Sequence, residues 1–269
     1  MKPGLSARCV RRMLALVALG SALGLAGSPT RAAEQHPAAI RIATGEWPPY
    51  TSENLNGDGI ACKLISEAFA AVGVKVAFVF YPWNRSLELT RRGGIEATAT
   101  WFESPDRRAD FHLSDPLFDS KFLLYYLKDT PISWQTVDDL SGLKIGATIG
   151  YFYGEAFARA EKTRQITIIR ASSDETNLKN LLRGRLDAFP LDQRVAEFMF
   201  ANDLPAADAA RIGSNAIAVH SRPQHLLISR KAANGEALIR LFNQGLNTIR
   251  GNGTYERIVN DATFSQKKP

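Results

Sequence analysis

The sequence of 269 residues is poor in cysteine and, after residue 32, has no apolar run long enough to span a membrane. Of its two cysteines, Cys9 falls in an N-terminal segment that we expect to be removed. Cys62 then stands alone on the apolar face of a predicted helix. A disulfide framework is therefore excluded, and a buried core thiol is favoured.

The sequence also lacks the spacings that mark metal, nucleotide and nucleophile sites. Its four histidines are scattered, and none pairs with Cys or carboxylates at ligand spacing, so we predict no metal. The glycines of "IGYFYGEAF" (149–157) do not match a nucleotide fingerprint, and no Gly-Lys-Ser/Thr follows them. No nucleophile elbow and no poised acid–base pair is recognisable. We therefore predict no cofactor and no enzymatic activity.

Residues 1–32 have the composition of a cleaved signal peptide. Basic residues precede an apolar run over 13–26, and Thr30 and Ala32 are the small residues that a signal peptidase reads. Ser28 stands where a lipoprotein would carry its lipidated Cys, so we expect a free protein that is not lipid-anchored. The pair Arg11-Arg12 leaves twin-arginine export open beside the general secretory route.

Removal of this segment changes the charge balance. Residues 1–32 contain five basic and no acidic residues, so the net charge of +6 falls to +1 without them. The high isoelectric point is mostly a property of the signal peptide, and nothing in the remaining chain points to nucleic acid.

Strand-like and helix-like segments alternate through the rest of the chain, which predicts an α/β fold with largely parallel sheets. The plan restarts near residue 144. "LTRRGGIEATAT" (89–100) and "LLRGRLDAFPL" (181–191) both end a helix with basic residues and Gly and enter a strand through an acid-Ala pair. This favours two similarly built lobes, although any βαβ unit can produce such a pattern.

We place lobe 1 at residues 37–127 and 225–269, and lobe 2 at residues 128–224. The polar, turn-rich segment 128–142 and "HSRPQH" (220–225) mark the two crossings between them. Two crossing strands form a hinge that lets two lobes close on a ligand.

Two tryptophans follow predicted strands. Trp47 stands in "ATGEWPPYTSE", where two prolines fix the backbone, and Trp83 stands in "YPWNR" before a helix. Ligands of open parallel sheets bind beyond the carboxyl ends of the strands, so the two rings are candidate walls of a site. Two partly buried core tryptophans would give the same pattern.

Charged candidates follow other strands. Arg107, after the turn Ser104-Pro105-Asp106, can clamp a carboxylate through two parallel hydrogen bonds, or be a solvated surface residue. Asp192 is the natural N-cap of a helix, a role that needs no ligand and does not exclude one. The helix start in 149–157 offers backbone N–H groups to an anion.

Taken together, these stretches resemble the family 3 extracellular solute-binding proteins, the periplasmic receptors of polar amino-acid ABC transporters. The resemblance is carried by the order and spacing of "TGEWPPYTSE", "GGIEATATWFESPDRRADFHLSDPL", "DDLSGLKIGATIGYFYGEAF", "GRLDAFPLD" and "GNGTYERIVND". It implies a monomer with a two-lobe type II periplasmic-binding fold, a two-strand hinge and the ligand in the cleft between the lobes.

The resemblance also implies roles for single residues. Trp47 and Trp83 match the aromatic positions that sandwich the ligand side chain. Arg107 matches the Arg that pairs with the ligand α-carboxylate, and Asp192 matches the acid that pairs with the α-ammonium.

Three further positions match the family's ligand contacts. Thr100 falls in the segment of lobe 1 that contributes hydroxyl and backbone contacts, and Tyr151 and Phe152 fall at the turn of lobe 2 that offers N–H groups. Aromatic residues at 101–102 and 151–153 replace the family's small hydroxyl residues, which indicates a smaller, flatter or more apolar ligand than an ordinary L-amino acid. An inward-pointing Arg85 would favour a second acidic group on the ligand.

The sequence therefore predicts a periplasmic binding protein for a small polar solute, an amino acid or a relative, with an ABC permease or a sensor protein as its partner. Two alternatives remain. One is an enzyme on the same scaffold, similar to cyclohexadienyl or arogenate dehydratases, with Glu46 or Glu103 as its acid. The other is a ligand-sensing input to a signalling protein.

Overall fold

The computed structural model describes residues 39–261, so the predicted signal peptide lies outside the described residues. The strands are β1 (Ile40–Thr44), β2 (Val76–Phe80), β3 (Ala97–Trp101), β4 (Phe111–Leu113), β5 (Phe118–Leu127), β6 (Lys144–Thr148), β7 (Thr167–Ala171), β8 (Ala188–Asp192) and β9 (Ile212–Ser229). The α-helices are α1 (Ile60–Ala70), α2 (Trp83–Arg91), α3 (Pro105–Asp110), α4 (Glu155–Lys162), α5 (Asp174–Leu182), α6 (Gln193–Asn202), α7 (Ala206–Arg211), α8 (Gly235–Gly251) and α9 (Thr254–Val259). Two 3-10 helices, η1 (Asn56–Asp58) and η2 (Val137–Leu140), complete the order. Within residues 39–261, no helix is long and apolar enough to cross a membrane.

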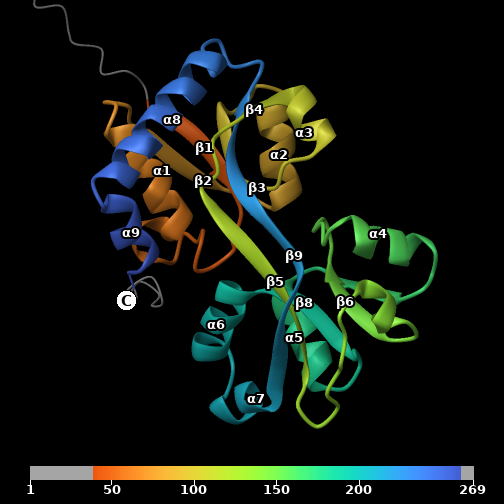
Figure 1. Ribbon diagram of the computed structural model, residues 1–269. Coiled ribbons are helices and arrows are strands. Elements are labelled where there is room, and N and C mark those ends of the chain that lie inside the picture. Colours follow the sequence, from red (N-terminus) through yellow and green to blue (C-terminus); the bar gives the residue numbers. More distant parts are fainter. Residues whose placement is uncertain (1–38, 262–269) are drawn as a thin grey trace, which may run out of the picture. The chain divides into compact units, whose positions relative to one another are not determined.

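The predicted α/β alternation is confirmed, and two long strands connect its halves (Figure 1). β1 pairs in parallel with β2 and β3, and β6 pairs in parallel with β7 and β8. β9 runs antiparallel to β3 at one end and to β5 along most of its length, while β5 also pairs with β8. The strand order is β2-β1-β3-β9-β5-β8-β6-β7.

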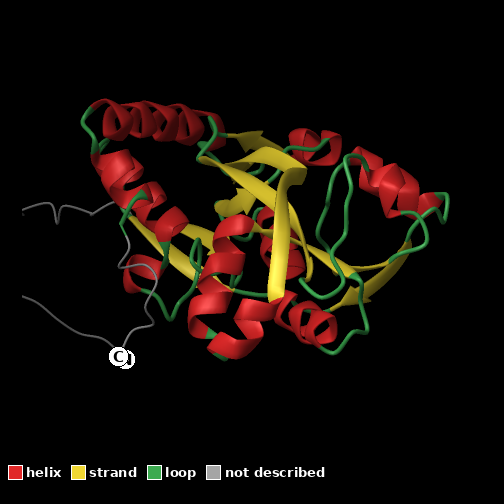
Figure 2. Ribbon diagram, turned by 60° about the horizontal axis from the view of Figure 1, so that its bottom comes forward, coloured by secondary structure: helices red, strands yellow, loops and turns green. Residues whose placement is uncertain are grey.

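The lobe containing β1 to β4 has buried side chains on both faces of its strands. Ile42, Leu64 and Phe242 belong to one cluster, between the strands and the helices α1 and α8. Trp101 and Phe111 belong to a smaller cluster on the side of α2. Figure 2 shows the resulting arrangement, with helices outside the strands.

The second lobe has its own core, built on β5, β6 and β8. Leu124, Ile145 and Phe189 are among its fully buried members. Trp47 and Tyr50, which follow β1, also pack against this cluster. The segment after β1 therefore contacts the side chains of both lobes.

Two predictions from the local sequence pattern need correction: a strand confined to Leu226–Ser229, and a capping box Ser172-x-x-Glu175 at the start of α5. The strand predicted over 226–229 is the end of β9, which already begins at Ile212. The cap of α5 is Ser173, whose hydroxyl accepts a hydrogen bond from the Thr176 N–H, and Ser172 lies one residue further out. The predicted lobe boundary at residue 128 falls just after β5, although β5 already pairs with β8 from Phe122 onward.

Candidate ligand-binding site

A cavity of about 60 Å³ brings together six of the eight predicted ligand-binding residues. Its lining consists of Trp47, Trp83, Thr100, Trp101, Phe102, Arg107, Phe122, Ile149, Gly150, Tyr151, Phe152 and Gln224. The residues come from the ends of β3 and β6, the loop after β1, the start of α2, the helix α3 and the crossing strands. Arg85 and Asp192 do not line it.

Trp47 is fixed by its own loop. Its N–H donates to the Thr51 carbonyl at 2.7 Å, its carbonyl accepts from Thr51 N–H at 3.1 Å, and its ring lies 4.6 Å from that of Tyr50. The side chain is 5% exposed, yet its indole Nε1 has no hydrogen-bond partner in the described part of the chain. A buried donor without a partner is costly, so this ring edge is suited to an acceptor that the cavity receives.

Trp83 opens α2 and forms another wall. Its Nε1 donates to the Glu46 carbonyl at 3.3 Å, and its ring stands perpendicular to that of Trp101, with centroids 5.3 Å apart. A Cβ on Gly45 would lie 2.6 Å from the Trp83 ring. The glycine at the end of β1 therefore makes room for this ring.

Arg107 is the cation of the cavity. Ser104 caps α3 by accepting a hydrogen bond from the Arg107 N–H, and the guanidinium donates to the Phe102 carbonyl at 2.6 Å. The guanidinium also stacks over the Trp101 ring at 4.8 Å, and burial lowers its pKa. Among residues 39–261, no carboxylate forms an ion pair with it.

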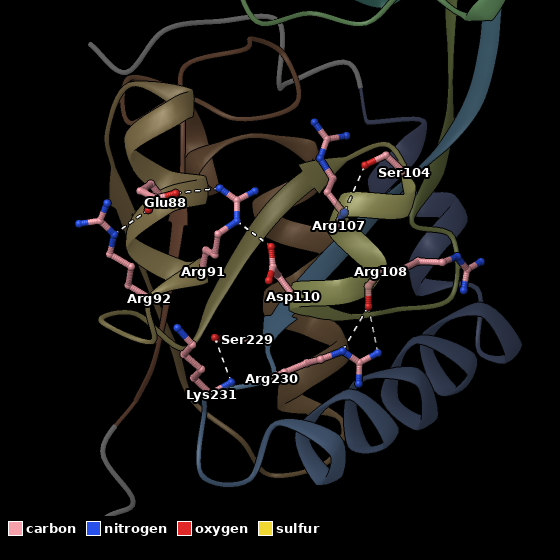
Figure 3. A network of polar contacts seen from close by, with 10 residues as sticks. All are labelled: Glu88, Arg91, Arg92, Ser104, Arg107, Arg108, Asp110, Ser229, Arg230 and Lys231. Carbon is pink, nitrogen blue, oxygen red and sulfur yellow. Dashed lines mark hydrogen bonds and ion pairs between the residues drawn. The ribbon is translucent and has the colours of Figure 1, made fainter.

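Figure 3 shows the contrast with neighbouring arginines. Arg91 turns toward Glu88 and Asp110, with which it forms ion pairs of 2.7 and 2.8 Å, while the Arg107 guanidinium points away from this network. Arg108, the next residue of α3, is paired with Glu103. Arg107 is thus placed to bind an anion supplied from outside the chain.

Thr100 lies at the base of the cavity with an unusual backbone. Its φ is +62°, a left-handed conformation that is strained for a β-branched residue, and the pairing of β3 with β9 shifts register at this point. Its hydroxyl donates to the Ala99 carbonyl at 2.8 Å.

Tyr151 and Phe152 form the wall opposite, in the loop between β6 and α4. The Tyr151 N–H donates to the Thr148 carbonyl at 3.1 Å, whereas no partner for the Phe152 N–H is found within the described residues. The Phe152 ring packs edge-on against His220 at 5.7 Å. Burial lowers the pKa of His220 to about 4, so this ring is neutral at pH 7 and extends the aromatic wall.

Gln224 was not recognised from the sequence. It lies on β9 where the strand passes β5, is 2% exposed, and lines the cavity. Its Oε1 has no hydrogen-bond partner, and no bond of its Nε2 is found in the described part of the chain. A polar residue within "HSRPQH" gives no signal of burial, because the burial comes from strand pairing.

The two remaining predicted residues lie elsewhere. Arg85 is exposed, and its guanidinium stacks on the Tyr81 ring at 4.6 Å. Asp192 ends β8 and is 1% exposed, and it lines a different cavity, of about 560 Å³. Its carboxylate accepts hydrogen bonds from the Tyr50 and Ser120 hydroxyls at 3.1 and 2.7 Å and caps α6.

A larger cavity of about 530 Å³ adjoins the first, since Trp47, Trp83, Ile149 and Tyr151 line both. It also contains Asp174, another residue that the sequence did not mark. Burial raises the pKa of Asp174 to about 6, although its carboxylate accepts hydrogen bonds from the hydroxyls of Thr148, at 2.5 Å, and Tyr151, at 3.5 Å. The described residues contain no cluster of His, Cys, Asp and Glu that could hold a metal.

Two lobes joined by β5 and β9, with this cavity between their strand ends, define the type II periplasmic-binding-protein fold. The chain belongs to the bacterial extracellular solute-binding proteins, family 3, whose family model matches residues 40–263.

Three similar proteins illustrate the range of this fold. The lysine/arginine/ornithine-binding periplasmic protein of Escherichia coli (strain K12) is 25% identical over 228 residues, which cover 83% of this chain and 86% of that protein. A histidine kinase sensor domain with similarity to periplasmic binding proteins has a TM-score of 0.72 at 17% identity, covering 83% and 95% of the two chains. AncCDT-1, an ancestral amino acid-binding protein and precursor of cyclohexadienyl dehydratase, has a TM-score of 0.65 at 21% identity, covering 82% and 92%.

Proposed function

We propose that this protein is a periplasmic receptor that captures a small carboxylate-bearing solute, an amino acid or a related compound, and presents it to an ABC importer. The observation that supports this best is Arg107, a largely buried guanidinium with no carboxylate partner among residues 39–261, facing an aromatic cavity. A carboxylate supplied by a ligand would complete this arrangement with two charge-assisted hydrogen bonds. Trp47 and Trp83 then bind the rest of the ligand.

Binding is coupled to closure of the lobes. Trp83, Thr100 and Arg107 follow the strands of the first lobe, while Tyr151 and Phe152 belong to the second. A ligand that contacts both sets binds the closed form better than the open form, and it shifts the equilibrium by that difference in affinity. The closed form is what the membrane partner recognises.

A thermal-shift screen against amino acids and small carboxylates tests the proposal. A ligand at 100 times its dissociation constant stabilises the folded chain by about 2.7 kcal/mol. We expect Arg107→Ala to remove this shift and Arg108→Ala, its exposed neighbour in α3, to retain it. Equal loss, or equal retention, in the two variants would contradict the role given to Arg107.

An enzyme on the same scaffold is the second candidate, and Asp174 favours it. This buried acid, with a pKa of about 6, lies at the cleft, whereas Glu103 is paired with Arg108 and its pKa is lowered. A carboxyl group that holds its proton near neutral pH can act as a general acid. Turnover of prephenate that is lost in Asp174→Asn would establish this activity, and the absence of product in the native protein rejects it.

A further inference from the structure

The cavity that contains Arg107 has a donor for a carboxylate but no anionic partner for an ammonium. None of its lining residues is an Asp or a Glu. The acids Glu46, Asp174, Glu175 and Asp203 line the adjoining cavity instead, where the Asp174 carboxylate already accepts hydrogen bonds from the hydroxyls of Thr148 and Tyr151. An α-amino acid bound here would neutralise Arg107 with its carboxylate and bring one further positive charge into a cavity lined mainly by aromatic rings. An isolated buried ammonium costs several kcal/mol unless it is paired.

Asp192 does not supply that partner. One of its oxygens already accepts three hydrogen bonds, from the Tyr50 hydroxyl and from the N–H groups of Arg194 and Val195. The other accepts the Ser120 hydroxyl at 2.7 Å. With 1% of its surface exposed, and in a different cavity, this carboxylate serves the end of β8 and the start of α6.

Two neutral groups of the Arg107 cavity are left unsatisfied instead. The Gln224 amide is 2% exposed and makes no side-chain hydrogen bond within the described residues. The Trp47 indole N–H, 5% exposed, also has no partner there. Buried polar groups are destabilising when they are left unpaired, so both are suited to groups that a ligand brings.

We propose that the solute is a carboxylate whose α-carbon bears a neutral hydrogen-bonding group, a hydroxyl or a carbonyl, and that Gln224 binds this group. The inference rests on the proposed function and specifies its ligand. A 2-hydroxy or 2-oxo acid offers one negative charge to Arg107, and its neutral group can pair with the Gln224 amide as donor or acceptor. The Arg107 guanidinium is then paired, and the ligand brings no second charge into the cavity.

The chemistry can be tested with matched ligands on the native protein. Two series share a side chain and differ only at the α-carbon: L-lactate, L-alanine and propionate, and L-3-phenyllactate, L-phenylalanine and 3-phenylpropanoate. Titration calorimetry should give at least tenfold tighter binding of the hydroxy acid than of the amino acid in one of the series. The hydroxy acid should also bind about tenfold more tightly than the unsubstituted acid, as one hydrogen bond predicts.

Gln224→Leu tests the residue itself. We expect this variant to bind the hydroxy acid no more tightly than the unsubstituted acid. Its affinity for the unsubstituted acid should stay within about twofold of that of the native protein. Equal weakening of both ligands would show a purely structural role and overturn the assignment of Gln224.

The outcomes separate the two proposals. Binding of an amino acid as tightly as its hydroxy analogue, or binding of neither series, overturns the inference about the ligand. The wider claim of a carboxylate receptor fails separately, when Arg107→Ala leaves the binding of every solute found in the screen unchanged.

Discussion

Asp174 offers the clearest test of how burial controls the charge in the cleft. It is the first residue of α5, is 9% exposed, and its pKa is raised from 3.8 to about 6 because burial disfavours the charged form. The neighbouring groups that face it are the hydroxyls of Thr148 and Tyr151, with Asp192 acting from further away.

The sign of the effect follows from linkage. The folded state holds the proton up to a higher pH than the unfolded state does, so Asp174 contributes most to stability below pH 4. That contribution is lost as the pH rises through 6. A shift of about two pKa units corresponds to about 3 kcal/mol at pH 7.

We therefore expect Asp174→Asn to be more stable than the native protein at pH 7 by up to about 3 kcal/mol, and to lose that advantage near pH 4. Asn has nearly the same shape, and its Oδ1 can still accept the hydrogen bond from Thr148. Urea unfolding of both proteins at several pH values measures the difference between their free energies of unfolding. The other titrating groups contribute equally to both proteins, so their contributions cancel in this difference. Glu175→Gln, at the next and exposed position of α5, removes only a surface ion pair with Lys179 and is the matched control. A difference between Asp174→Asn and the native protein that does not vary with pH would refute the reasoning.

Three further changes have defined outcomes in the same unfolding assay or in ligand titration. A Cβ on Gly245 would lie 1.8 Å from the Ala68 carbonyl, so Gly245→Ala should force α8 from α1 and cost about 3 kcal/mol, while Gly251→Ala, with nothing within 4 Å, should be near neutral. Ser173→Ala removes the cap of α5 and should cost about 1 kcal/mol of unfolding free energy; no loss would show that the Thr176 N–H finds another acceptor. Tyr50→Phe removes the 3.1 Å hydrogen bond to Asp192 and should weaken ligand affinity about tenfold without changing the ligand preference, whereas unchanged affinity would exclude a role in closure.

The helices and strands whose apolar residues recur with a clear helical or strand spacing could be predicted from the sequence. The restart of the α/β plan near residue 144 and the helix after Asp192 occur where the sequence predicts them, at β6 and α6, because apolar spacing and capping are local properties. β9 is different. Its residues include Gly213, Asn215 and Pro223, which are poor strand formers, and its extended state comes from pairing with β5 from Ile212 to Gln224 and with β3 and β4 beyond. Such long-range pairing leaves no local pattern.

The same distinction explains the candidate site. Trp47, Trp83 and Arg107 could be proposed because they follow strands, and the ends of parallel strands meet at one edge of a sheet. Gln224 could not, because its place in the cavity depends on β9. For Asp174 the local pattern was misleading, since an acid in the first turn of a helix is usually solvated, and only the approach of Tyr151 and Thr148 buries it.

The loop after β1 contacts both the Arg107 cavity and the second lobe. Pro48 and Pro49 and the paired hydrogen bonds between Trp47 and Thr51 hold this segment as a rigid turn. One of its rings, Trp47, lines the Arg107 cavity, and the hydroxyl of Tyr50 reaches Asp192 at the end of β8. Because the turn is rigid, Trp47 and Tyr50 keep fixed positions relative to each other, so a solute that contacts Trp47 in the proposed function acts on a segment that is also hydrogen-bonded to the second lobe. In that proposal the solute shifts the balance between the open and closed forms only by its difference in affinity for them.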